Sequence, residues 1–250
     1  MDKGSKVRVH FQSSVPWREP SNAMELLGIL DKYADVDLAP QRYGSSDART
    51  IEIGSYSEAD IRALWAKVGG GIFKTGKPWN CIYHVFFIKT VWAKATSSFW
   101  IHLSGEFFRS EGRSERFVNL CKEIYSWGRM DHGFVALEDE YQTKNEFGAG
   151  RGVGGPNLTK GLPGIYWANF FGPVYVAWMG ENKFDKLGDY ASERLLDGGW
   201  LVFARDNLFN FDPRTTGPKE NQLIKHLGRD AFFEMQRPHK RIRTPEFWGD

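Results

Sequence analysis

Two strand-like segments follow one another in the middle of the chain, and they constrain the fold more than any other feature. Ile82–Lys89 and Phe99–Phe107 are rich in β-branched and aromatic residues, and no helical pattern separates them. We therefore predict two neighbouring antiparallel strands. Because helical and strand-like patterns interleave elsewhere, the sequence predicts an α+β fold, with a mixed, largely antiparallel sheet packed against amphipathic helices.

Two helices have clear signals. The stronger one is predicted to be capped by Ser114 and to stop at Gly128, with apolar residues at helical spacing between them. Ser57 and Asp60 resemble a capping box that starts the other. The apolar positions are Phe117, Leu120, Cys121, Ile124 and Tyr125 in the first helix, and Ile61, Leu64, Trp65 and Val68 in the second.

The remaining elements have shorter signals. Ser21 is predicted to cap an early helix, and Pro218 to lie in the first turn of a last one. Gly69–Gly71 is expected to end the helix after Ser57, and Ala34–Arg49 reads as a loop. Alternating or continuous apolar residues predict further strands at Lys6–Gln12, Thr50–Ile53, His132–Leu137 and Gly199–Ala204.

The chain is long enough for a large core, since about 70% of the surface of such a chain can be buried on folding. The glycine-rich stretch Glu138–Lys160 has little apolar content and is the best linker candidate. We predict a single domain over residues 1–250, with a possible two-lobed division near residues 141–160.

The net charge, the N-terminal segment, the uncharged run 161–180 and the cysteine content indicate which partners and which cellular compartment to expect. The 33 lysine and arginine residues nearly balance 31 aspartate and glutamate residues, which argues against a general nucleic-acid binder. The N-terminus lacks the apolar core of a secretory signal. The uncharged run 161–180 contains Pro163 and Pro173 and predicts a strand, a turn and a helix start rather than a membrane span. Two cysteines suit a reducing compartment. We expect a cytoplasmic protein.

Two glycine-rich motifs resemble nucleotide sites only superficially. Gly71–Lys77 matches most of a P-loop, but Pro78 stands where the motif needs Ser or Thr, and a helix rather than a strand precedes it. Gly150–Gly155 matches the dinucleotide fingerprint without the flanking strand and helix. We interpret both as loops and expect no cofactor. No metal-ligand spacing of His or Cys occurs, so no metal is expected either.

An enzymatic alternative rests on two histidines. His84 and His102 lie on the adjacent strands predicted above, and Glu106 is four residues from His102. A hydrolase acting through these three residues is conceivable, although buried structural histidines are the commoner case. Cys121 faces the core side of its helix, which favours an inert thiol.

Two charged clusters could contact a partner. Glu138, Asp139 and Glu140 form a compact acidic cluster that could dock a basic partner, or simply be a solvated loop entry. The C-terminal residues Arg237, Lys240, Arg241 and Arg243 could touch phosphate, but a solvated tail or packed arm is favoured.

Aromatic residues make up 15% of the chain. Exposed Trp and Tyr could stack on sugars, which leaves a carbohydrate-binding module as another alternative. Several aromatic residues instead stand at core spacing, which favours packing in a large core. The examples are Trp65, Phe117, Tyr125, Trp167 and Phe203.

The second half carries a succession of short motifs. They are His132–Leu137, the aromatic-Asn-Gly-Pro block within residues 161–173, Gly180, Asp197–Gly199 before a buried strand, and His226–Gly228. In this order, over Phe117 to Gly228, the chain resembles the immunity proteins of bacterial contact-dependent and type VI secretion toxin systems.

This resemblance implies a non-enzymatic α+β protein that binds and neutralises one cognate toxin domain by stoichiometric protein–protein interaction. It implies no cofactor and no catalytic residue. From the charge balance and the segment character, we also expect no nucleic-acid or membrane partner. Residue chemistry suggests structural roles for the quoted glycines and prolines. Pro163-Gly164 would set the entry into a strand, Gly172-Pro173 would end it and start a helix, and Gly198-Gly199 would allow a tight turn.

Overall fold

A computed structural model describes residues 4–88, 96–145, 158, 161–212, 214, 216–233 and 243–245. The described residues up to Met130 form one compact unit, unit 1, and those from Asp131 onwards form a second, unit 2. The boundary between the units lies between Met130 and Asp131, whereas the sequence offered a possible division near residues 141–160. Within each unit the strands are antiparallel and pack with helices, so the predicted α+β class is confirmed.

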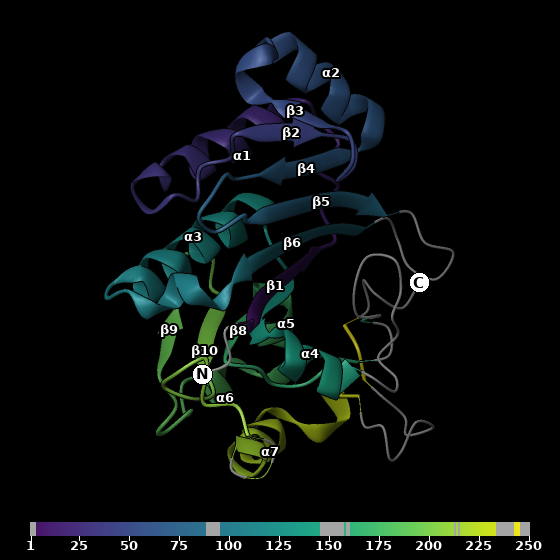
Figure 1. The fold of residues 1–250 in the computed structure, drawn as a ribbon. Coiled ribbons are helices and arrows are strands. Elements are labelled where there is room, and N and C mark those ends of the chain that lie inside the picture. The colour runs from purple at the N-terminus through teal and green to yellow at the C-terminus, as the bar shows by residue number, and fades with distance from the viewer. Residues whose placement is uncertain are drawn as a thin grey trace. The chain divides into compact units, whose positions relative to one another are not determined.

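Unit 1 contains an antiparallel sheet built around the two consecutive strands of the sequence (Figure 1). The strands lie in the order β3 (Thr50–Glu52), β2 (Arg42–Gly44), β4 (Gly70–Lys74), β5 (Ile82–Ile88), β6 (Thr96–Ser104) and β1 (Lys6–Ser13). β5 and β6 pair antiparallel as predicted, with Tyr83 opposite Ile101 and Val85 opposite Phe99. These side chains are buried and form part of the core of unit 1.

Three helices pack on one face of this sheet: α1 (Ser21–Asp31), α2 (Glu58–Val68) and α3 (Arg113–Gly128). All five apolar residues predicted to face inward on α3 are buried. On α2, the buried positions are Ile61 and Trp65. Short 3₁₀ helices cover Ala34–Val36, Ile53–Ser55 and Gly105–Arg109.

The capping box of α2 is present: the Asp60 amide donates to the Ser57 hydroxyl at 3.2 Å, and the Ser57 amide donates to the Asp60 carboxylate at 2.9 Å. The other two predicted caps are wrong. α3 follows Gly112, and α1 follows Pro20, so neither Ser114 nor Ser21 is the cap. Glycine at φ +75° starts α3 because its backbone reaches that region without strain.

The predicted loop 34–49 is wrong in part, because it contains β2. The run Gly69–Gly71 was predicted only to end α2, but it also begins a strand. Gly69 terminates the helix in the left-handed region, but Gly70 and Gly71 belong to β4. A side chain at Gly70 would meet the Val85 carbonyl at 2.2 Å, so only glycine allows β4 to pair this closely with β5. The P-loop-like motif is therefore a strand followed by a turn.

Unit 2 contains four strands in the order β7 (His132–Leu137), β8 (Ala168–Phe171), β10 (Trp200–Phe203) and β9 (Ser192–Arg194). Its helices are α4 (Glu138–Asn145), α5 (Pro173–Met179), α6 (Glu181–Phe184) and α7 (Thr216–Leu227), with a 3₁₀ helix at Arg229–Ala231. The core packs α5, α6 and α7 around residues that include Phe171, Tyr175, Val202, Leu223 and Leu227.

The uncharged run 161–180 forms the predicted strand, turn and helix start, with Pro173 in the first turn of α5. No helix in the described part of the chain is long and apolar enough to cross a membrane. Glu138–Lys160 is not a linker throughout, because its first eight residues form α4. The motif Gly150–Gly155 lies outside the described residues.

Candidate functional site

The alternation of three adjacent strands in unit 1 divides their side chains between two faces. Val7, Val9 and Phe11 of β1 point to the helices and are buried, so Lys6, Arg8 and His10 lie on the opposite face. We call this opposite surface the open face, although His10 and Ser98 within it are buried. Its other residues in β5 and β6 are Ile82, His84, Phe86, Ser98, Trp100, His102 and Ser104.

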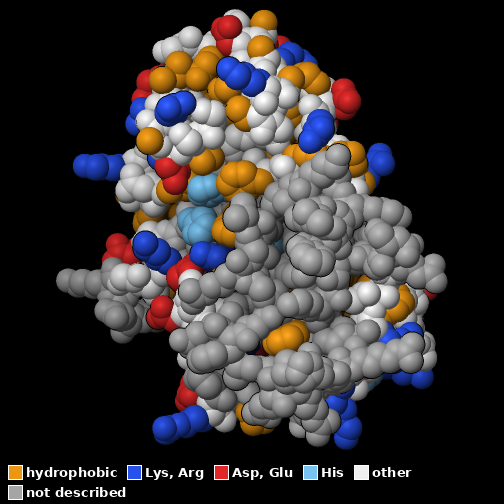
Figure 2. Space-filling model, turned by 90° about the vertical axis from the view of Figure 1, so that its right-hand side faces the viewer, with side chains coloured by type: hydrophobic (Ala, Val, Ile, Leu, Met, Phe, Trp, Pro, Cys, Tyr) orange, Lys and Arg blue, Asp and Glu red, His pale blue; other side chains and the backbone are white. Residues whose placement is uncertain are grey.

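Aromatic rings meet along the open face. The Trp100 ring lies 5.2 Å from the His10 ring and 6.4 Å from the Phe86 ring, measured between centroids. The Arg8 guanidinium lies 5.3 Å from the centre of the Trp100 ring. The indole N–H of Trp100 donates to the Ser98 hydroxyl at 2.7 Å, which fixes the ring. Phe86 and Trp100 remain half-buried, and Figure 2 shows hydrophobic and histidine side chains exposed beside each other on the surface.

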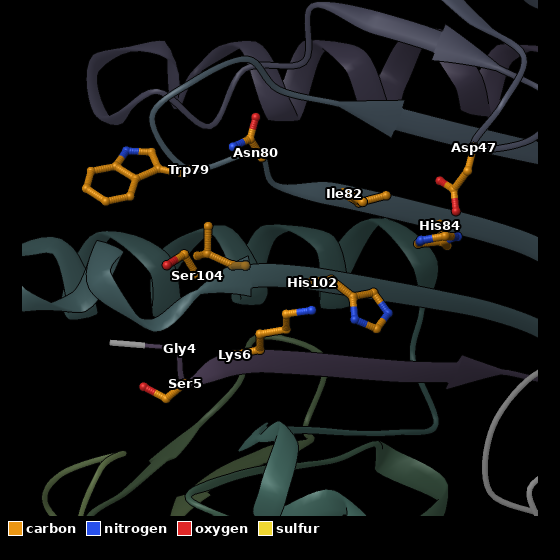
Figure 3. Close-up of a pocket in the computed structure, with 11 residues that line it drawn as sticks. Gly4, Ser5, Lys6, Asp47, Trp79, Asn80, Ile82, His84, His102 and Ser104 are labelled. Carbon is orange, nitrogen blue, oxygen red and sulfur yellow. The ribbon is translucent and has the colours of Figure 1, made fainter. Parts of the chain in front are cut away.

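A cavity of about 630 Å³ opens next to these rings. His84 and His102 line it, with their ring centroids 5.4 Å apart. In Figure 3 the amine of Lys6 points toward His102, and the carboxylate of Asp47 points toward His84. Trp79 and Ile82 form apolar parts of the wall.

The charges around the cavity are partly matched. Asp47 pairs with Lys74 at 3.4 Å, and the Lys74 ammonium also donates to the Asp47 carbonyl at 2.8 Å. Burial lowers the pKa of His84, and the nearby Lys74 and Arg8 act in the same direction, whereas Asp47 opposes them. His84 is therefore neutral near pH 7 and can both donate and accept a hydrogen bond.

Ring contacts position Trp79 at the rim of the cavity. The Arg113 guanidinium lies 4.6 Å from the Trp79 ring centre, and Trp79 meets the Phe107 ring edge-on at 5.6 Å. Since Arg113 begins α3, the helix layer positions Trp79 beside the strands that carry the histidines.

The structure brings together two of the three residues of the enzymatic alternative. His84 and His102 share the cavity, but Glu106 does not line it. Glu106 is exposed and pairs with Arg109 at 3.8 Å. The carboxylate that belongs to the cavity is Asp47, which sequence reasoning missed because it stands in a loop far from both strands. The alternation of Lys6, Arg8 and His10 was the signal that could have placed Lys6 here.

The described residues provide neither a metal-binding cluster nor a reactive thiol. Within the described ranges, no cluster of three His, Cys, Asp or Glu side chains is placed to hold a metal ion. Cys81 and Cys121 are both buried, and burial raises the pKa of each thiol, to about 12 for Cys81. The prediction that Cys121 is inert agrees with this burial.

The predicted acidic cluster does not form one surface patch. Asp139 is exposed and Glu138 is half-buried, with an oxygen that accepts from the Gln142 amide at 2.6 Å. Glu140, by contrast, is fully buried. The reason is that α4 begins at Glu138, so the three side chains point in different directions around a helix rather than along a loop.

Glu140 belongs to a buried ion network in unit 2. It pairs with Arg205 and with Lys144, the latter at 2.8 Å. Glu220 of α7 pairs with the same two cations, at 3.2 Å and 2.8 Å respectively. Burial raises the pKa of Glu220, and the Lys144 ammonium opposes that shift. The network therefore ties α4 and α7 to the segment that follows β10.

The basic tail is described only in part. Arg237, Lys240 and Arg241 lie outside the described residues. Arg243 pairs with Asp230 at 3.2 Å, and its guanidinium lies 5.4 Å from the Trp178 ring centre. Arg243 is thus exposed while it contacts neighbouring residues of unit 2, which agrees with the favoured interpretation of a solvated tail or packed arm.

The tryptophans favour packing over an open stacking platform. Eight of the ten lie in the described part of the chain, and none of those eight is fully exposed. Trp17, Trp65 and Trp167 are buried. A groove lined by several exposed tryptophans is therefore absent from the described residues.

Comparison with solved structures adds a likeness of fold. No family model matches the chain, and no curated protein matches it. Among solved structures, the Pseudomonas aeruginosa T6SS protein PA0821 is similar, with a TM-score of 0.58. The match covers 97% of this chain and 78% of that one, at 10% sequence identity. At this identity, the comparison shows a shared fold.

Proposed function

We propose that this chain is an immunity protein of a type VI secretion system, which neutralises a cognate secreted toxin domain by binding it. Two independent observations support the proposal. The motifs over residues 117–228 resemble those of such immunity proteins, and the solved structure of similar fold is named a T6SS protein. The proposed action is stoichiometric binding without catalysis or a cofactor.

The observation that carries a binding role is the open face of unit 1. Trp, Phe and Arg are enriched at the energetically important centres of protein interfaces. Here Phe86 and Trp100 are half-buried, and Arg8 lies over the Trp100 ring. A stable interface buries at least about 1,000 Å², so neighbouring strands would take part in it.

The charges of the open face indicate the chemistry of the toxin surface. Lys6 and Arg8 of β1 and Lys74 of β4 lie on this side, and Asp47 is the acid beside them. A partner segment that combines apolar and acidic side chains would complement this surface, and a strongly basic one would be repelled. This reasoning favours a toxin other than a highly basic nuclease.

Co-expression tests the proposal. The chain is expressed with the toxin domain encoded beside its gene, and growth and co-purification are both measured. We expect restored growth and a 1:1 complex. Cell death together with the lack of any complex would refute the function.

Variants of the open face test the surface in the same assay. Arg8→Glu and Trp100→Ala should each weaken binding at least about tenfold if they are hot spots, because hot-spot residues, which are enriched in Trp and Arg, cost about 2 kcal/mol or more when removed. The matched control is Arg62→Glu on α2, a partly exposed arginine that pairs with Glu58 at 3.6 Å. Binding that is equally strong in all three variants would remove the open face from the interface while leaving the function intact.

A further inference from the structure

The cavity beside the open face offers mainly hydrogen-bond donors. They are the ammonium of Lys6, the imidazoles of His84 and His102, the amide of Asn80 and the hydroxyls of Ser5 and Ser104. Among the described lining residues, Asp47 alone carries a carboxylate, and Lys74 balances its charge at 3.4 Å. A ligand in the cavity would therefore meet the positive charge of Lys6 together with neutral donors.

We propose that this cavity binds a carboxylate, with Lys6 supplying the charge and His84 and His102 donating hydrogen bonds. Its volume of about 630 Å³ lies within the usual range for small-ligand sites. Trp79 and Ile82 provide an apolar wall for the carbon atoms that carry the carboxylate.

A single negative charge fits better than a phosphate. A phosphate group on a ligand carries about −1.5 to −2 at neutral pH, and the second charge would face Asp47 without a further cation in the lining. Phosphate sites also commonly use arginine forks or the amides of a helix N-terminus. The lining contains neither among the described residues.

Carboxylate binding in this cavity is coupled to protonation of the imidazoles of His84 and His102. The charged and titratable groups near the two imidazoles come from every neighbouring element: Lys6 and Arg8 from β1, Lys74 from β4, Asp47 from the loop after β2, and the histidines themselves from β5 and β6. A bound carboxylate favours the charged form of both imidazoles and raises their pKa values. By reciprocity, affinity for the carboxylate rises as the pH falls.

The carboxylate has two possible sources. It belongs either to a small molecule or to an Asp or Glu side chain of the toxin, and the second source rests on the proposed function. In that case the cavity is the specificity pocket of the interface, because it lies next to Trp100 and Phe86 on the same face.

The first arm of the experiment uses the purified chain alone. Butyrate, a monocarboxylate, and inorganic phosphate are titrated at pH 6.0 and 7.5, and the imidazole NMR signals are followed, with His226 of unit 2 as the internal reference. We expect saturable shifts at His84 and His102 with butyrate, with an affinity on the order of fivefold higher at pH 6.0. Tighter binding of phosphate than of butyrate at pH 7.5, where phosphate is mostly doubly charged, would overturn the single-charge argument.

The second arm uses the toxin domain and the variants Lys6→Gln and His102→Asn, with Lys67→Gln on α2 as the matched control. A toxin carboxylate in the cavity predicts at least tenfold weaker binding by the first two variants and unchanged binding by the control. The proposal is overturned if butyrate causes no saturable shift and the toxin binds all variants equally. If the unaltered chain fails to bind the toxin, the proposed function fails, and the butyrate titration still decides whether the cavity binds a carboxylate.

Discussion

Asn169 is a polar residue whose role only its surroundings reveal. It is fully buried, its amide donates to the carbonyls of Tyr166 at 2.9 Å and Val202 at 3.1 Å, and its oxygen accepts from the Tyr166 amide at 2.8 Å. One side chain thus closes the turn before β8 and bridges to β10. Three satisfied hydrogen bonds explain why a polar residue stands within the aromatic block.

His132 is a buried residue with a measurable consequence. It lies among the rings of Phe134, Phe171 and Tyr175, with centroids about 6 Å away, and burial lowers its pKa to about 3. The unfolded chain, with an ordinary histidine pKa, binds the proton first. Stability that is fully present above pH 6.5 is therefore lost as the pH falls, by about 1.4 kcal/mol per unit.

Urea unfolding of unit 2 between pH 7 and pH 4 measures this loss. We expect the pH slope below 6.5 to be smaller for His132→Gln than for the unaltered chain, whatever the stability of the variant at pH 7. The control His226→Gln, which changes an exposed histidine of the same unit, should keep the original slope. Equal slopes in all three proteins would show that His132 does not cause the pH dependence.

At the scale of elements, α4 is held by buried charge in addition to the apolar packing of Tyr141 on Phe134. Glu140 is fully buried with Arg205 and Lys144, and Glu220 of α7 completes the network. Removing one partner of such a group leaves a buried charge uncompensated, which costs about 3–5 kcal/mol. We therefore expect Glu140→Gln to lower the free energy of unfolding of unit 2 by about this amount.

The control for this prediction is Glu138→Gln on the same helix. Glu138 is half-buried at the start of α4, so its substitution should change stability by less than about 1 kcal/mol. Denaturant unfolding at pH 7 compares the two variants. A similar small effect in both would contradict the role assigned to the network.

At the scale of the whole molecule, each unit has its own core and its own residues whose signals can follow its unfolding. Both cysteines, Cys81 and Cys121, are buried in unit 1, whereas the ion network and His132 belong to unit 2. A substitution that weakens unit 2 should leave the thiols protected. We expect the thiols of Glu140→Gln to stay unreactive toward a thiol reagent at denaturant concentrations that already unfold unit 2.

The measurement follows thiol labelling and a tryptophan or histidine signal of unit 2 across one denaturant series. The fully unfolded chain should label two thiols and the native chain none, because burial holds both thiol pKa values high. Labelling that rises at the same midpoint as the unit 2 signal would show instead that the units unfold together.

The sequence by itself determined the elements with strong local signals. The pairing of β5 with β6, the inward face of α3 and the capping box of α2 depend on residues close together in the chain, where period and capping chemistry act directly. Short elements such as β2 and β4 were missed because their pairing depends on distant strands, and because the glycines of β4 read as a stop.

Only the tertiary structure decided which charged residues are surface groups and which residues share a site. Glu140 reads as part of an exposed acidic run, yet it is buried, because Arg205, 65 residues further along the chain, pairs with it. Likewise His84 and His102 could be foreseen as neighbours, but Lys6, Asp47 and Trp79 join them through strand order and loop placement. Local sequence encodes helix and strand periods, whereas burial and electrostatic pairing depend on long-range contacts that no short pattern records.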